Sequence, residues 1–162
     1  RDMPDLGKDL IKYMDDELFH RHLETHPTKD IHDDHINGSL TVIWRDWDKI
    51  IEDNLKMIYI SSVNPYEKKG PHLHKKRNSY FTCIHGKVVF VIKKPDGKYV
   101  EIVSSEESPV LVSVPKNYPS AHINLSSKIS RVLTLADISW KPNDGEMENV
   151  NLLDYDWKKW NK

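Results

Sequence analysis

The stretch NPYEKKGPHLHKKRNSYFTCIHGKVVFVI, residues 64–92, contains the clearest fold signal in this chain of 162 residues. Two segments rich in aromatic and β-branched residues, Tyr80–Ile84 and Val88–Ile92, are separated only by His85-Gly86-Lys87. Short apolar runs joined by a connection that contains glycine are typical of a β-hairpin. The stretch therefore predicts two adjacent antiparallel strands.

Two histidines, His72 and His74, come shortly before this hairpin. Residues two apart in an extended strand point to the same side, so we expect both imidazoles to face one space. Positive side chains surround the pair, namely Lys68, Lys69, Lys75, Lys76 and Arg77. Imidazoles beside concentrated positive charge indicate a pocket for an anionic substrate that undergoes proton transfer. The alternatives are a polar pair on a solvent-facing strand and a solvated run of charge.

Short β segments continue on both sides of the hairpin, and turn residues rather than helices separate them. They are Leu40–Trp44, Met57–Val63, Tyr99–Val103, Pro109–Val114, His122–Leu125 and Arg131–Ile138. A series of seven or eight short strands predicts an all-β sandwich or barrel, of which a jelly roll fits best.

The first segment, residues 1–38, has a different pattern. Apolar residues recur there at helical spacings, which predicts one or two helices: Leu6, Leu10, Ile11, Met14, Leu18, Phe19 and Leu23. We therefore divide the chain into an N-terminal helical extension, 1–38, and a jelly-roll domain with a C-terminal tail, 39–162. Five histidines of the extension could form a metal cluster, but exposed or capping roles are favoured: His20, His22, His26, His32 and His35.

The composition excludes several classes of function. The net charge of −1 gives no overall attraction to nucleic acid or to a membrane surface. No apolar run approaches the ~20 residues of a membrane span, and no signal-peptide pattern is present. The single cysteine, Cys83, excludes an intrachain disulfide and suits a reducing compartment. We expect a cytoplasmic protein.

The His-x-His pair, with Gly86 twelve residues after His74, resembles the first signature of the cupin family. In metal-binding cupins this signature continues with a glutamate, and the corresponding positions here hold Asn78 and Ser79. The resemblance therefore implies the cupin jelly-roll barrel without the usual glutamate ligand.

The second cupin signature, Pro-x-Gly-x-x-His-x-x-x-Asn, is similar to residues 115–124, but Ser120 stands in place of the ligand histidine. A transition metal bound by imidazoles normally takes three or four protein ligands, so we expect no metal. A metal-dependent cupin enzyme with His72, His74 and His122 as ligands is the first alternative.

Within this family, the chain resembles the sugar-nucleotide branch over about residues 40–157. The motif Gly70-Pro71-His72-Leu73-His74-Lys75 is similar to Gly-Gly-His-Ala-His-Lys of the dTDP-4-keto-6-deoxyglucose 3,4-ketoisomerases. Residues from Val114 to His122, followed by Asp137, Trp140, Pro142 and Glu146, resemble the back half of the dTDP-4-dehydrorhamnose 3,5-epimerases. The resemblance implies a homodimeric isomerase of dTDP-linked sugars in polysaccharide or deoxysugar biosynthesis, without metal or other cofactor.

Two departures from this branch concern the chemistry. The ketoisomerases carry an arginine where this chain has Lys69, which keeps the charge but lacks the bidentate fork. The epimerases place an acid tyrosine near the position of Leu133 or Thr134, and this strand contains no tyrosine. A non-catalytic cupin that binds a sugar or a nucleotide is therefore the second alternative.

The chemistry of the branch explains the predicted catalytic residues. A hydrogen beside a C4 ketone is acidic enough for a near-neutral imidazole to remove, which gives an enediolate. His74 is the predicted base, and His72 is the predicted orienter or second acid/base. A tyrosine is the proton donor, with Tyr80, Tyr66 and Tyr118 as candidates, and Asp137 is the carboxylate that could orient a histidine.

The predicted substrate-binding residues are Lys69, Lys75 and Arg77 for the diphosphate, together with Tyr66, Tyr118, His122 and Asn124. In a regular strand, Lys75 and Arg77 would face away from the histidines, so they reach the pocket only if the strand bends. Glu146 and Glu148 are interpreted as surface residues.

Overall fold

The computed structural model describes residues 19–48, 51 and 54–161. Strands dominate this part of the chain: β1 (Phe19–His22), β2 (Thr25–Lys29), β3 (Ile36–Thr41), β4 (Met57–Val63), β5 (Lys68–His74), β6 (Ser79–His85), β7 (Lys87–Lys93), β8 (Tyr99–Ser105), β9 (Val110–Val114), β10 (Ser120–Asn124), β11 (Ser130–Ala136) and β12 (Met147–Asn149). Two short 3-10 helices are η1 (Asp46–Asp48) and η2 (Trp157–Trp160). Within the described residues, no helix is long and apolar enough to cross a membrane.

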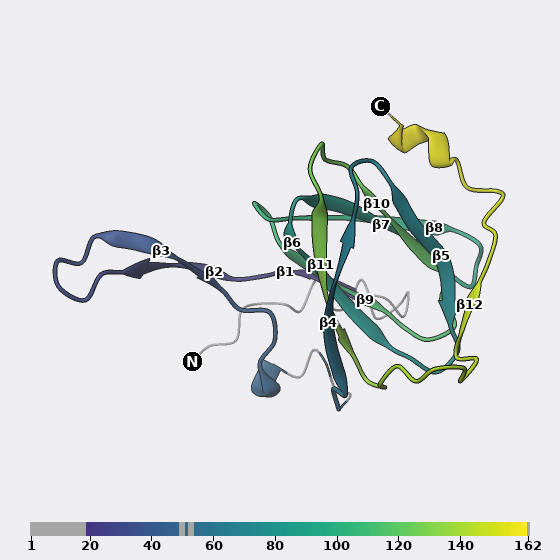
Figure 1. Cartoon of the computed structure of the whole chain (residues 1–162), viewed down its shortest axis with the longest axis horizontal. Coiled ribbons are helices and arrows are strands. Elements are labelled where there is room, and N and C mark those ends of the chain that lie inside the picture. Colours follow the sequence, from purple (N-terminus) through teal and green to yellow (C-terminus); the bar gives the residue numbers. More distant parts are fainter. Residues whose placement is uncertain (1–18, 49–50, 52–53, 162) are drawn as a thin grey trace.

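Two five-stranded antiparallel sheets form the body of the molecule, in the orders β1-β9-β6-β11-β4 and β12-β5-β10-β7-β8. Figure 1 shows these strands gathered in one barrel-like body. The core between the sheets contains side chains from both, including Cys83 of β6, Phe90 of β7 and Val132 of β11. The prediction of an all-β jelly roll is confirmed.

The C-terminal tail covers the outer face of the second sheet. Strand β7 reads as a continuous apolar run because it is buried on both sides. Phe90 points into the core, whereas Val91 packs outward against Leu152 and Tyr155 of the tail. In Figure 1 the tail follows this sheet before it reaches η2. The tail is therefore held against the barrel, and residues within it can take part in a site.

A helix was predicted near the N-terminus, but the described residues of this segment form strands. Residues 1–18 lie outside the described residues. Strand β1 pairs with β9, with Phe19 opposite Ser113, so it forms an edge of the first sheet. Strands β2 and β3 form a separate hairpin that projects from the barrel (Figure 1). At Phe19, pairing with a distant strand outweighs the helical spacing of the sequence.

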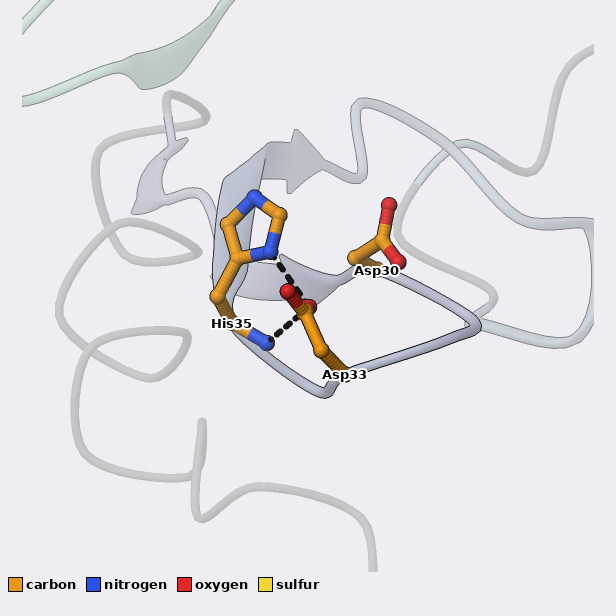
Figure 2. A group of neighbouring side chains, drawn as sticks. All are labelled: Asp30, Asp33 and His35. Carbon is orange, nitrogen blue, oxygen red and sulfur yellow. Dashed lines mark hydrogen bonds and ion pairs between the residues drawn. The ribbon is translucent and has the colours of Figure 1, made fainter.

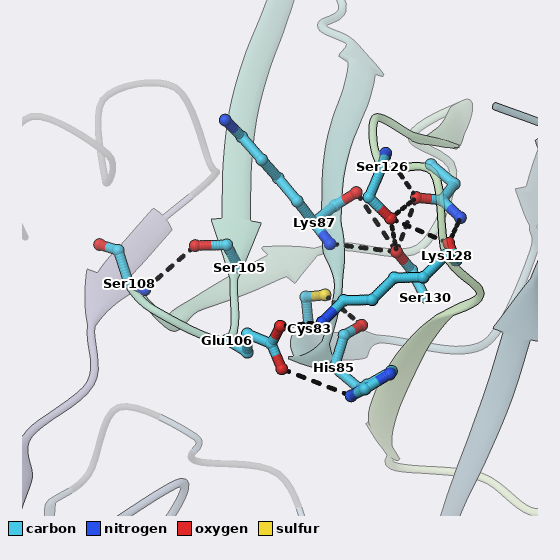
Figure 3. A network of polar contacts seen from close by, with 10 residues as sticks. Cys83, His85, Lys87, Ser105, Glu106, Ser108, Ser126, Lys128 and Ser130 are labelled. Carbon is cyan, nitrogen blue, oxygen red and sulfur yellow. Dashed lines mark hydrogen bonds and ion pairs between the residues drawn. The ribbon is translucent and has the colours of Figure 1, made fainter. Parts of the chain in front are cut away.

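Gly86 connects β6 to β7 in a conformation that favours glycine, with a φ of +83°. A Cβ atom at this position would lie 2.1 Å from Oγ of Ser130. That hydroxyl accepts the backbone N–H of Lys87 at 3.0 Å (Figure 3). The glycine of the motif is therefore required by the turn and by the close approach of Ser130.

Candidate active site

A cavity of about 200 Å³ lies between the two sheets. Its imidazoles come from His72, His74 and His122, and its cations from Lys69 and Arg77. Its hydroxyl groups come from Tyr59, Ser61, Ser79, Tyr118 and Ser120. The sequence prediction that His72 and His74 face one space is confirmed, because both line this cavity.

Glu146 lies in the tail directly before β12, and the pairing of β12 with β5 brings it against His74. Met147 is opposite His74 in the register. The Glu146 side chain is buried, with 4% of its surface exposed, and its Oε1 lies 2.7 Å from Nδ1 of His74. Its Oε2 accepts the backbone N–H groups of Lys76 and Arg77. The interpretation of Glu146 as a surface residue was wrong.

The His74–Glu146 pair has a defined arrangement of protons. Burial would raise the pKa of Glu146, but hydrogen bonds from His74 and from the backbone of Lys76 hold it below its usual value. An ionised carboxylate only accepts hydrogen bonds, so Nδ1 of His74 carries the hydrogen. Burial lowers the pKa of His74 by more than Glu146 raises it. The ring is therefore neutral near pH 7, and Nε2 has a free lone pair.

His72 has a different kind of partner. Asn149 lies directly opposite it in the register, and the amide oxygen is 3.1 Å from Nδ1 of His72. A neutral amide orients an imidazole but stabilises its charged form much less than a carboxylate does. Of the two cavity histidines, His74 therefore has a carboxylate partner that would stabilise its protonated form, and His72 has a neutral amide partner.

The cations predicted to bind the diphosphate differ in position. Lys69 is exposed and Arg77 is buried, and both line the cavity. Strand β5 ends at His74, so the alternation of a regular strand does not apply to Arg77, which turns back into the cavity. Lys75 instead points outward, with its ammonium group 3.5 Å from Glu148.

His122 lines the cavity from β10 and packs against Phe90, with ring centroids 5.5 Å apart. Burial, with Lys69 and His72 nearby, lowers the pKa of His122 to about 4. Its Nε2 atom is buried and has no hydrogen-bond partner among the described residues. His122 is therefore neutral at pH 7 and offers one polar atom to a ligand.

The tyrosines are distributed differently from the prediction. Tyr118 lines the cavity, but Tyr80 packs on the outer face of the first sheet. Tyr66 lies in a separate depression beside η2. Tyr59, which the sequence reasoning missed, enters the cavity from β4, and it is directly opposite Thr134 of β11 in the register. The tyrosine that β11 lacks thus has a counterpart on the adjacent strand.

Asp137 and Asn124 organise loops, and neither lines the cavity. The carboxylate of Asp137 accepts two hydrogen bonds of 2.8 Å from Asn78 and orients no histidine. The fully buried amide of Asn124 donates to the carbonyl groups of Val63, Asn64 and Lys128. These contacts replace the catalytic and substrate-binding roles predicted for the two residues.

The three cavity histidines do not form a compact ligand set. In the described part of the chain, one group of three possible ligand atoms lies within 4.8 Å of one another, and it consists of Asp30, Asp33 and His35. This group is at the tip of the β2–β3 hairpin, where His35 is hydrogen-bonded to Asp33 (Figure 2). The geometry therefore does not favour a metal bound by His72, His74 and His122.

Comparison with protein families gives a match over most of the chain. The family model described as FdtA, WxcM-like, C-terminal, matches residues 21–154. The chain belongs to the FdtA family. A comparison with curated proteins gave no match.

Solved structures similar to this FdtA-family chain share its fold at low sequence identity. RmlC, a dTDP-6-deoxy-D-glucose-3,5-epimerase from Legionella pneumophila solved with dTDP-4-keto-L-rhamnose, is 16% identical with a TM-score of 0.72, covering 86% of this chain and 75% of RmlC. A dTDP sugar isomerase from Desulfovibrio desulfuricans is 17% identical with a TM-score of 0.67, covering 82% and 83%.

The capsular polysaccharide assembling protein CapF from Staphylococcus aureus is 20% identical with a TM-score of 0.57. The match covers 62% of this chain and only 27% of CapF, so the FdtA-family chain corresponds to a fraction of that protein. These likenesses support the cupin jelly-roll prediction for the fold.

Proposed function

We propose that this chain is an isomerase of a nucleotide-linked 4-keto-6-deoxy sugar, with His74 as the base that removes a proton beside the ketone. The observation that carries the proposal is the buried His74–Glu146 pair at a cavity that also contains tyrosine hydroxyl groups. The membership in the FdtA family and the similarity to RmlC, which was solved with dTDP-4-keto-L-rhamnose, support this substrate class.

The first step transfers a proton from the sugar carbon beside the ketone to Nε2 of His74. The electrons of the broken C–H bond form a C=C bond to the ketone carbon, and the ketone oxygen gains negative charge. Glu146 stabilises the resulting imidazolium because its carboxylate accepts the hydrogen bond from Nδ1. His72, held by Asn149, orients the substrate.

The second step returns a proton from a tyrosine. Tyr59 and His74 belong to different sheets, so they approach a sugar in the cavity from different sides. Protonation on the opposite face of the same carbon inverts it, as in an epimerase. Protonation of the former ketone carbon, with transfer of the hydroxyl proton of the neighbouring carbon to the former ketone oxygen, moves the ketone, as in a 3,4-ketoisomerase. Tyr118 provides a second hydroxyl group in the same cavity.

The nucleotide part of the substrate would lie outside this inner region. Lys69 is exposed where it lines the cavity, and an ammonium group acts as a point charge for a phosphate. The resemblance to the sugar-nucleotide branch favours a dTDP-linked substrate. The reaction as written needs neither a metal nor a redox cofactor.

The test is proton NMR of the purified protein with dTDP-4-keto-6-deoxyglucose in deuterated water. We expect deuterium to replace hydrogen at C3, or at C3 and C5, and His74→Gln to slow the exchange by about 100-fold or more. His85→Gln is the matched control because His85 lies outside the cavity and pairs with Glu106.

Exchange at C3 alone, with a 3-keto product, would identify a ketoisomerase, and exchange at both carbons would identify an epimerase. Binding of the substrate without any exchange would reject the isomerase and favour the non-catalytic sugar-nucleotide binding protein. Exchange that persists in His74→Gln would reject His74 as the base.

A further inference from the structure

Arg77 is a buried cation that the mechanism above does not use. Its side chain is almost fully enclosed, with 6% of the residue exposed, and it lines the same cavity as His74. Its Nε atom is buried and has no hydrogen-bond partner among the described residues. A guanidinium group stays charged at any physiological pH, so this burial requires compensation.

Glu146 compensates the charge of Arg77 only in part. The distance from Nε of Arg77 to Oε1 of Glu146 is 3.8 Å, which is too long for a hydrogen bond. That same oxygen lies 2.7 Å from Nδ1 of His74, and the other carboxylate oxygen accepts two backbone N–H groups. The carboxylate is therefore already used by other donors, and the donors of the guanidinium remain available to a ligand in the cavity.

The shared carboxylate also fixes where Arg77 can act. Because Oε1 of Glu146 is close to both groups, the guanidinium lies beside the imidazole of the base. Lys69, in contrast, is exposed. A buried charge acts more strongly on a nearby group than an exposed one, since water screens it less. The two cations of the cavity therefore suit different parts of one substrate.

We propose that Arg77 is a catalytic residue that donates hydrogen bonds to the C4 oxygen of the sugar while that oxygen gains negative charge. This inference rests on the proposed isomerase function. As the C–H electrons move into the C=C bond, the C4 oxygen becomes an oxyanion, and a buried cation fixed beside it stabilises it before the proton returns. Lys69 then serves the diphosphate, so this proposal gives Arg77 a role different from the diphosphate binding that the sequence suggested for Lys69, Lys75 and Arg77.

A pKa effect agrees with this placement. Arg77 contributes to lowering the pKa of His74, which keeps the base neutral before the reaction. When the proton moves to His74, the negative charge that forms on the sugar oxygen offsets the repulsion between imidazolium and guanidinium.

The experiment compares Arg77→Met with the wild-type chain in two separate measurements. The first is the rate of deuterium exchange into saturating dTDP-4-keto-6-deoxyglucose, and the second is the affinity for dTDP, which has no sugar ketone. We expect exchange to fall by about 100- to 1000-fold. We expect the dTDP affinity to stay within about twofold, and dilute guanidinium chloride to restore part of the exchange.

Lys76→Met is the control, because Lys76 is an exposed neighbour whose recorded contact with Glu146 uses only its backbone N–H. Arg77→Lys, which keeps the charge without the planar fork, covers the case in which Arg77→Met does not fold. We expect its exchange to lie between those of the wild type and a His74→Gln variant.

Three results would overturn the proposal while leaving the isomerase in place. They are wild-type exchange in Arg77→Met, a loss of dTDP affinity equal to the loss of exchange, and a lower melting temperature with no rescue by guanidinium. The last result would make Arg77 only a structural counter-ion of Glu146. Absence of exchange in the wild type would overturn both the isomerase and the role of Arg77.

Discussion

Glu146 accepts a hydrogen bond of 2.7 Å from Nδ1 of His74, although 72 positions of sequence separate the two residues. The carboxylate fixes the tautomer of the imidazole and stabilises its protonated form. A pair of this kind gives a base that is neutral at rest and can hold a proton during turnover.

Glu146→Gln should therefore slow deuterium exchange by about 100-fold or more, with the substrate affinity much less affected. Glu146 raises the pKa of His74, so this pKa should be lower in Glu146→Gln. The pH profile of the variant should therefore have a lower maximal rate and reach that maximum at a lower pH than the wild type. The measurement is the pH dependence of exchange. Glu148→Gln is the control, because Glu148 is half exposed and pairs with Lys75 outside the cavity. An unchanged rate and pH profile in Glu146→Gln would remove Glu146 from the mechanism.

Tyr59→Phe should separate the two proton transfers. Removal of the proton by His74 does not need the tyrosine. Deuterium exchange at the carbon that His74 deprotonates should therefore remain. Return of the proton needs the donor, so product formation should fall by about 100-fold. Tyr80→Phe should form product at nearly the normal rate, because Tyr80 packs on the other face of the sheet. Normal product formation by Tyr59→Phe would transfer the donor role to Tyr118.

Local signals in the sequence were enough to predict the barrel and the shared orientation of His72 and His74. The hairpin predicted from residues 80–92 exists as β6 and β7, and the two-residue spacing places His72 and His74 at one cavity. Tyr59 could also have been found, because the alternation in Met57–Val63 puts Tyr59, Ser61 and Val63 on one face of β4. The donor candidates predicted from the sequence, Tyr66, Tyr80 and Tyr118, did not include Tyr59.

Other parts of the site depend on contacts that no local pattern contains. Glu146 reaches His74 only because a three-residue strand of the tail pairs with β5. Arg77 reaches the cavity because β5 ends at His74 and the chain turns there. Asn124 stands where the cupin signature has its asparagine, and only the hydrogen bonds reveal that this residue holds a loop.

Asn124→Ala should lower the free energy of unfolding by about 3 kcal/mol or more, because it leaves several buried carbonyl and hydroxyl groups without partners. The affinity of the folded variant for dTDP should be unchanged, since Asn124 does not line the cavity. Urea unfolding and dTDP titration measure the two quantities. Ser126→Ala removes one partly exposed hydroxyl of the same network and should lower the free energy of unfolding by about 1 kcal/mol. Weaker dTDP binding by Asn124→Ala at normal stability would restore the substrate-binding role.

The stability of the chain should decrease in mild acid because of His122. The pKa of His122 is about 4 in the folded chain and 6.5 for an ordinary histidine, so the unfolded chain takes up the proton first as the pH falls. Above pH 6.5 both states are neutral at this residue and the effect is absent. Between pH 6.5 and 4 the folded state loses stability, by roughly 3 kcal/mol in total.

Urea unfolding at a series of pH values should show this loss in the wild type and a smaller loss in His122→Gln, which has no group that titrates there. Lys69 and His72 add to the effect because their electrostatic interactions with His122 oppose its protonation. His74 also has a lowered pKa. Its contribution to the loss of stability is the same in the wild type and in His122→Gln, so it cancels when the two proteins are compared. Equal slopes in the two proteins would mean that His122 accepts a proton in the folded chain, through a rearrangement that opens the cavity wall.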